Sequence, residues 1–133
     1  MIHRLTDLSD ADRSRMVFVC PTPAEADALA SIGVLAICIP AKTPSRWLEL
    51  ERWTNVTKSI TGFRFVMLRG CESPLYNACQ LQCHGASKVD LLEIPGGIMA
   101  WLAARQELSQ WEKLRDLARL VKQPAKIELK VVS

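Results

Sequence analysis

Four short apolar segments constrain the fold of this chain more than any other feature. The first three are apolar without interruption, which is typical of strands buried on both faces of a parallel sheet. The four segments are Met16–Val19, Val34–Ile39, Phe65–Leu68 and Val89–Ile94. Because helix-length stretches separate them, the sequence predicts a three-layer α/β fold, with a mainly parallel sheet of four strands flanked by helices.

Ser or Thr directly before Pro marks the first three helix starts, and capping boxes, formed by Thr22 with Glu25 and by Ser109 with Glu112, mark the first and the last helix. The predicted helices are Pro23–Ile32, Pro44–Trp53, Pro74–His84, Ile98–Glu107 and Gln110–Lys122. In the last helix, the residues expected to face the core are Trp111, Leu114, Leu117, Ala118 and Val121. Lys126–Val132 alternates polar and apolar residues, which predicts a half-exposed edge strand.

A chain of 133 residues fits one domain, which we place over residues 15–133. Residues 1–14 are polar and are expected to form a loosely packed lead-in, and residues 55–62 a polar link. No apolar run approaches the roughly 20 residues that cross a bilayer. The first twelve residues do not resemble a signal peptide. We therefore expect a cytoplasmic protein without a membrane partner.

Cysteine and charge content narrow the class of protein further. The five cysteines are odd in number, and several lie inside apolar runs, so a disulfide scaffold is not expected. The net charge of +3 comes entirely from residues 111–133. Their basic residues include Arg115, Arg119, Lys122 and Lys126, the candidate contacts for nucleic acid.

The strand ends carry the candidate ligand site, because ligands of parallel sheets gather at the carboxyl ends of the strands. These ends are Cys20–Thr22, Pro40–Thr43, Arg69–Ser73 and Pro95–Gly97. Cys20 and Cys71 are expected to approach each other if the first and third strands are neighbours. They are either inert buried thiols or a reactive pair, although neither loop has a His to activate a thiolate.

The order of elements over residues 16–105 resembles the Toprim domain of primases, phage primase-helicases and topoisomerases. The first strand with Glu25, Asp27 and Ala28-Leu29 resembles that family's first motif. Leu92–Gly97 resembles its late strand and Leu-Pro-Gly turn. The resemblance implies a metal-binding α/β domain associated with DNA replication or mobile elements.

The acids of the Toprim site are replaced in this chain. Pro21 stands where the family has its proposed acid–base Glu. The magnesium-binding Asp-x-Asp falls on Arg69-Gly70-Cys71, or in another register on Gly70-Cys71-Glu72. A hard cation needs carboxylate oxygens. The comparison therefore predicts a degenerate site with no catalytic residues, no retained Mg²⁺ and no other cofactor.

Several residues allow both a functional and a structural reading. Arg69, Glu72, Gly96 and Gly97 are candidate phosphate ligands, but Arg69 and Glu72 also suit an exposed loop. Glu25 and Asp27 are either helix-start acids or a relocated metal site. Three further residues could bind zinc or simply pack on their helix: Cys79, Cys83 and His84.

Three functions remain open on the sequence. The first is a non-catalytic Toprim-like binding or assembly module, contacting nucleic acid or a replication protein. The second is a small phosphate-ligand domain or enzyme at the strand ends. The third is a structural partner whose Lys126–Val132 strand adds to the sheet of another chain, including a second copy of itself.

Overall fold

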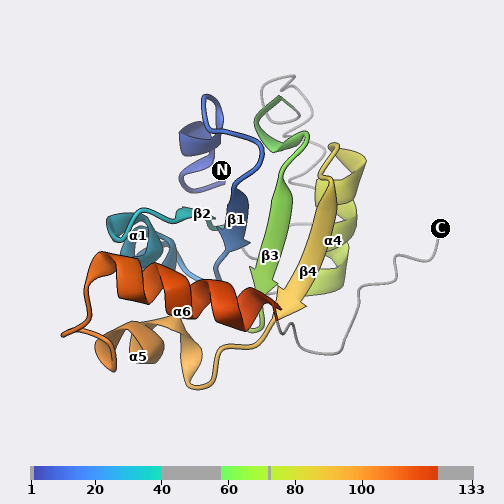
Figure 1. The fold of residues 1–133 in the computed structure, drawn as a ribbon. Helices are drawn as coiled ribbons and strands as arrows, with labels where there is room; N and C mark the ends of the chain where they lie inside the picture. The colour runs from blue at the N-terminus through green and yellow to red at the C-terminus, as the bar shows by residue number, and fades with distance from the viewer. Residues whose placement is uncertain (1, 40–57, 72, 123–133) are drawn as a thin grey trace.

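The computed structural model describes residues 2–39, 58–71 and 73–122, and every structural statement below concerns these residues. Four strands form one parallel sheet in the order β2-β1-β3-β4 (Figure 1). They are β1 (Met16–Val19), β2 (Leu35–Ile37), β3 (Arg64–Leu68) and β4 (Lys88–Leu92). The predicted α/β fold with a parallel four-stranded sheet is confirmed.

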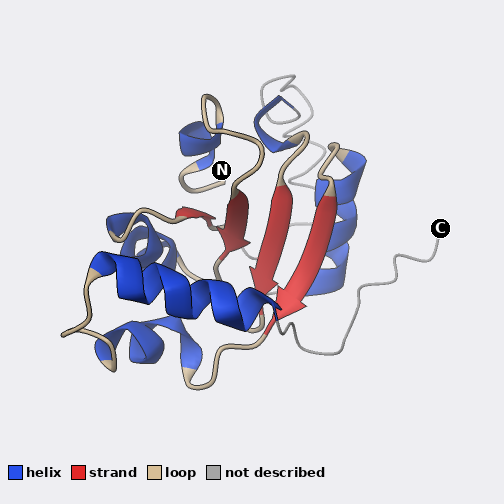
Figure 2. Ribbon diagram, in the orientation of Figure 1, coloured by secondary structure: helices blue, strands red, loops and turns tan. Residues whose placement is uncertain are grey.

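Helices lie between the strands and beside the sheet (Figure 2). The described helices are the 3-10 turn η1 (Leu5–Leu8), α1 (Pro23–Ser31), α4 (Pro74–Cys83), α5 (Gly97–Ala103) and α6 (Gln110–Lys122). The split between the last two helices is confirmed, although α5 ends at Ala103 rather than at Glu107. The predicted helix over 44–53 and the predicted edge strand over 126–132 lie outside the described residues.

Each face of the sheet supports its own core, because neighbouring strand residues point to opposite sides. Val17 and Phe65 pack with α4 and η1 on one face. Phe18 and Val66 pack with α1, α5 and α6 on the other. All four side chains are at most 3% exposed. Because both faces of the strands are buried, successive strand residues have to be apolar. This agrees with the uninterrupted apolar runs in the sequence.

Local hydrogen bonds account for where two of the helices start. The Thr22 hydroxyl accepts from the Glu25 amide at 3.3 Å and donates to its carboxylate at 2.9 Å. Ser109 and Glu112 make the same pair of contacts at the start of α6. Both predicted capping boxes are confirmed. Ser73 differs from Thr22 and Ser109. The helix α4 begins directly after it, as predicted, but the Ser73 backbone is left-handed (φ 48°) and its side chain makes no capping hydrogen bond.

The expectation of a loosely packed lead-in is wrong. Leu8 is fully buried and Ile2 is 5% exposed, both within the core that includes α4. His3 also exchanges backbone hydrogen bonds with Cys38, at 2.9 and 3.2 Å. Two apolar side chains in a polar segment are enough to fix it, because they complete a core that the sheet and α4 leave open.

The expected polar link before β3 is wrong over its described part. Residues 58–60 are helical, and Ile60 is fully buried beside Phe63. The guanidinium of Arg13 holds this turn by donating to the carbonyls of Ser59 and Lys58, each at 2.7 Å. It also lies over the Phe63 ring, 4.3 Å from the ring centroid.

Within the described residues, no helix combines the length and apolarity needed to cross a membrane.

Truncating Leu8 tests whether the N-terminal segment belongs to the domain. We expect Leu8→Ala to lower the free energy of unfolding by about 2–5 kcal/mol, since it removes a fully buried side chain. The measurement is urea unfolding followed by circular dichroism. The control is Leu75→Ala on α4, where the side chain is 60% exposed, and it should change the value by less than about 0.5 kcal/mol. Equal effects would show that the segment does not stabilise the core.

Candidate functional site

The carboxyl edge of the sheet brings three of the predicted loops together. The strand pairing continues past the strands, with the Cys20 amide donating to the Ile37 carbonyl and the Arg69 amide to the Leu92 carbonyl, both at 2.8 Å. Cys71 donates its thiol to the Val19 carbonyl at 3.4 Å. Adjacency of β1 and β3, on which the expected approach of Cys20 and Cys71 depended, is confirmed.

The thiols at this edge are not poised as nucleophiles. Burial raises the pKa of the Cys71 thiol to about 12. Burial, and secondarily the neighbouring Cys71, raises the pKa of the Cys20 thiol even further above its ordinary value. Both groups are therefore protonated at neutral pH, and a protonated thiol neither attacks an electrophile nor binds a metal well. The arrangement favours inert cysteines, of which Cys20 is buried and Cys71 partly buried.

Arg69, the leading candidate for holding a phosphate, forms an ion pair with Glu93. Its Nη1 lies 2.8 Å from the Glu93 Oε2, and the two side chains are 58% and 56% exposed. Such a surface pair contributes little stability, but it cancels the positive charge that would attract an anion. Glu93 was not among the residues predicted from the sequence, although pairing of Leu68 with Leu92 makes Arg69 and Glu93 the next facing pair.

The glycine turn after β4 is held by a hydrogen bond within the turn. Gly96 and Gly97 have φ values of 76° and 85°, a backbone conformation that favours glycine. The Gly97 amide donates to the Ile94 carbonyl at 2.8 Å, so this donor is already used in the turn. Glu72, the remaining candidate ligand, lies outside the described residues. Within the described part of this edge, the Arg69–Glu93 pair carries little net charge for an anion, and protonated thiols and an arginine are not the oxygen ligands that a magnesium ion prefers.

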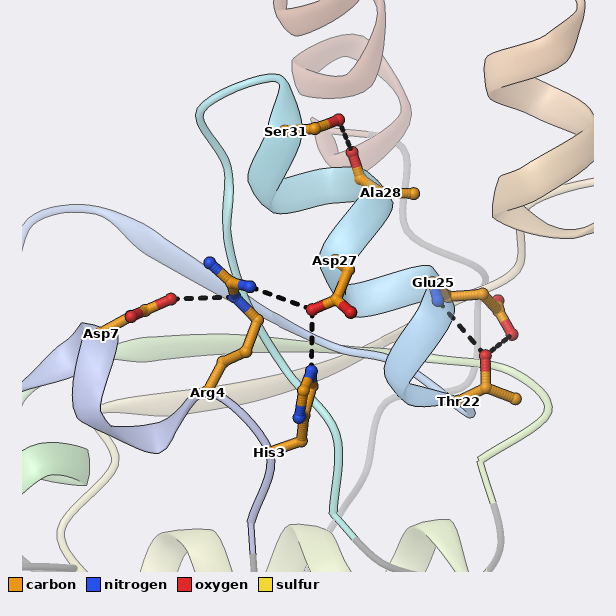
Figure 3. Close-up of polar contacts among 8 residues, drawn as sticks. All are labelled: His3, Arg4, Asp7, Thr22, Glu25, Asp27, Ala28 and Ser31. Atoms are coloured by element: carbon orange, nitrogen blue, oxygen red, sulfur yellow. Dashed lines mark hydrogen bonds and ion pairs between the residues drawn. The ribbon is translucent and has the colours of Figure 1, made fainter.

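The two acids of α1 serve structural roles (Figure 3). Glu25 belongs to the capping box. Asp27 Oδ1 lies 2.7 Å from His3 Nε2 and 3.0 Å from Arg4 Nη1, and Arg4 also pairs with Asp7 at 2.9 Å. Hydrogen bonds from His3, and then from Arg4, hold the pKa of the Asp27 carboxyl below its ordinary value. These contacts tie the N-terminal segment to α1.

The metal-site readings find no support in the described part of the chain. There, no group of three or more His, Cys, Asp or Glu side chains is arranged to hold a metal ion. Cys79 and Cys83 are separate free thiols on α4, the first partly buried and the second exposed. His84, directly after α4, is partly buried like Cys79, whereas Cys83 faces solvent.

The outward face of α6 gathers cations beside an exposed indole. Trp111 is 67% exposed and Ala118 is exposed as well, so the expectation that these two residues face the core is wrong. Arg115 lies over the Trp111 ring, 5.1 Å from the centroid. The Arg115 and Arg119 side chains are 40% and 71% exposed, and Lys122 is exposed as well. Leu117 and Val121, on the opposite side of the helix, are buried as expected.

Three arginines of this region form ion pairs with the same carboxylate, that of Asp116. Asp116 Oδ2 lies 3.4 Å from Arg105 Nε, and its Oδ1 lies 3.6 Å from Arg115 Nε and 4.0 Å from Arg119 Nη1. One negative charge among three guanidinium groups leaves a positive excess. The candidate Lys126 lies outside the described residues, so the basic surface is defined here by Arg115, Arg119 and Lys122.

Comparison of the chain with protein-family models, with curated proteins and with solved structures finds no match. The Toprim resemblance therefore stays a prediction, and the evidence for a function comes from the residues themselves.

Thiol labelling tests the assignment of the cysteines at the carboxyl edge. At pH 8, iodoacetamide should modify the exposed Cys83 first, while Cys20 and Cys71 should react only after denaturation, because their raised pKa values keep them protonated. Mass spectrometry of peptides from native and denatured samples measures this. Labelling of Cys20 or Cys71 in the native protein as fast as Cys83 would restore the reactive-thiol reading.

Neutralising Asp27 tests the contact between the N-terminal segment and α1. A carboxyl with a lowered pKa stabilises the fold above its ordinary pKa of 3.8, and this contribution disappears as the pH falls through the lowered value. Asp27→Asn should therefore reduce Tm at pH 7 and lose less stability than the parent protein below pH 3.8. Thermal melts across pH 2–7 measure this. The control is Asp10→Asn, at an exposed acid in the same segment. It should change neither Tm at pH 7 nor the loss of stability at low pH.

Proposed function

We propose that this chain is a non-catalytic, Toprim-like domain that binds nucleic acid through the outward face of α6. The observation that carries the proposal is the exposed set formed by Trp111, Arg115, Arg119 and Lys122. Cations bind phosphates and release counterions, whereas an exposed aromatic ring stacks on bases. The domain would act as a binding or assembly module alongside replication or mobile-element proteins, an association that rests on the sequence resemblance.

Helical spacing supports a common binding face. Residues four and three positions apart lie on the same side of a helix. Trp111, Arg115, Arg119 and Lys122 follow that spacing over the whole of α6. The guanidinium of Arg115 next to the indole also keeps the ring held on the surface. Such a row suits a charged polymer better than a small ligand, because it extends along about three turns of the helix.

Among the described residues, the candidate groups at the carboxyl edge of the sheet are already engaged in other contacts or protonated, which favours α6 as the binding surface. The Arg69 cation is paired with Glu93, and the Cys20 and Cys71 thiols are protonated. An enzyme or phosphate-ligand site at this edge would need other groups. Pairing through the predicted edge strand over 126–132 stays a prediction.

Binding to fluorescein-labelled oligonucleotides tests the proposal. Fluorescence anisotropy with a single-stranded and a duplex probe, measured at several salt concentrations, should give an affinity that falls as salt rises. The double variant Arg115→Ala/Arg119→Ala should bind more weakly. For a single strand, it should also reduce the slope of log K against log salt by roughly 0.7 for each phosphate that the protein no longer neutralises. Binding should not depend on Mg²⁺.

The matched control is Lys58→Ala/Lys88→Ala, which removes the same charge from residues outside α6. It should retain most of the affinity. Absence of salt-dependent binding by the parent protein, or equal losses in the two double variants, would contradict binding through α6.

A further inference from the structure

A groove of about 360 Å³ runs between α6 and the start of the sheet. One side of it is formed by residues that lead into β1 and β2, including Arg15, Met16 and Val34. The other side is formed by α6, including Leu114 and Ala118. Figure 1 shows α6 crossing in front of the sheet. Because the groove lies where β1 and β2 begin, it is separate from the carboxyl edge of the sheet.

The groove adjoins the basic face of α6. Trp111, Arg115, Ala118 and Lys122 are four, three and four positions apart, so they form one line along the helix. Ala118 lies in the groove wall. By helical spacing, Trp111, Arg115 and Lys122 therefore lie on the same side of α6 as Ala118, next to the apolar residues of the groove wall.

The opposite wall carries a matching charge. Arg15 is exposed, and its Nη2 donates to the Gly33 carbonyl at 2.7 Å, which fixes the side chain along the wall. Among the described residues that line the groove, Arg15 is the one with a charge, and none is acidic. The described lining is thus mainly apolar, with the charge of Arg15 on one wall, and the cations of α6 follow on the helix beside Ala118.

We propose that this groove holds single-stranded nucleic acid, an inference that rests on the proposed function. Bases would contact Trp111 and the apolar surface formed by Met16, Val34 and Leu114. Phosphates would lie between Arg15 and the cations of α6. This combination of a positive groove and an aromatic stacking surface is typical of proteins that bind single strands without sequence preference. A duplex keeps its bases paired and stacked inside the helix, so the single strand, whose bases are free to stack on Trp111, should bind more tightly.

Blocking the groove tests the assignment. Ala118 is exposed, so Ala118→Glu places a negative charge in the groove without disturbing the core. It should weaken binding of a single-stranded deoxythymidine oligonucleotide by at least about tenfold. Trp111→Ala should weaken it by between about fivefold and a hundredfold, the loss typical of one stacked base. Arg15→Ala should weaken it and lower its salt dependence.

The control for Ala118→Glu is Ala24→Glu, which adds the same charge at an exposed position of α1. It should leave the affinity within about twofold of the parent protein. Circular dichroism melts of all variants establish that they are folded. Because Arg15→Ala and Trp111→Ala do not replace core residues, the test does not depend on one variant.

The outcomes separate this inference from the proposed function. If the parent protein binds no nucleic acid, both fail. If binding is lost in Arg115→Ala/Arg119→Ala but is unaffected by Ala118→Glu and Arg15→Ala, the outward face binds and the groove does not. A duplex that binds as tightly as the single strand also overturns the groove assignment. Poly-glutamate binding in the groove more tightly than the oligonucleotide would assign it to an acidic peptide instead.

Discussion

Burial of both faces of a short parallel sheet is the constraint on which the rest of this structure depends. Each strand contributes side chains to two cores, and removing either covering layer would expose residues such as Phe18 or Phe65. The helices are therefore placed where apolar area has to be covered. The same requirement explains why Ile2 and Leu8, in an otherwise polar segment, pack onto the sheet. The position of α6, and with it the position of the basic face, follows from this demand.

Charge is distributed unevenly between the two candidate surfaces. At the carboxyl edge, parallel register places the residues after β3 and β4 side by side, and Arg69 meets Glu93. At α6, Arg115 and Arg119 of the helix and Arg105 before it all have Asp116 as their nearby carboxylate. Exposed opposite charges at contact distance largely cancel, whereas an excess of one sign produces a field that attracts a polyanion. The positive excess thus lies at α6, whereas the Arg69 charge at the strand ends is paired.

Side-chain periodicity predicted elements better than it predicted exposure. The spacing of Trp111, Leu114, Leu117 and Val121 correctly indicated a helix with one apolar side, yet Trp111 is exposed while Leu117 is buried. Trp111 lies in the first turn of α6, at the end of the helix that meets the end of α1 through the bond from Gln110 to the Ile32 carbonyl. A hydrophobic residue at a helical spacing shows which side of the helix it occupies. It does not show how far the neighbouring layer reaches.

The sequence by itself determined the class of fold, the parallel sheet and both capping boxes, because uninterrupted apolar runs and helix-start residues act over a few neighbouring positions. Tertiary structure alone decided which charges meet, which includes the pairing of Asp27 with His3 and Arg4. It also decided that Trp111 stays on the surface and that a groove lies beside it. These features join residues far apart in the chain. Their geometry depends on sheet order and helix placement, which local patterns do not specify.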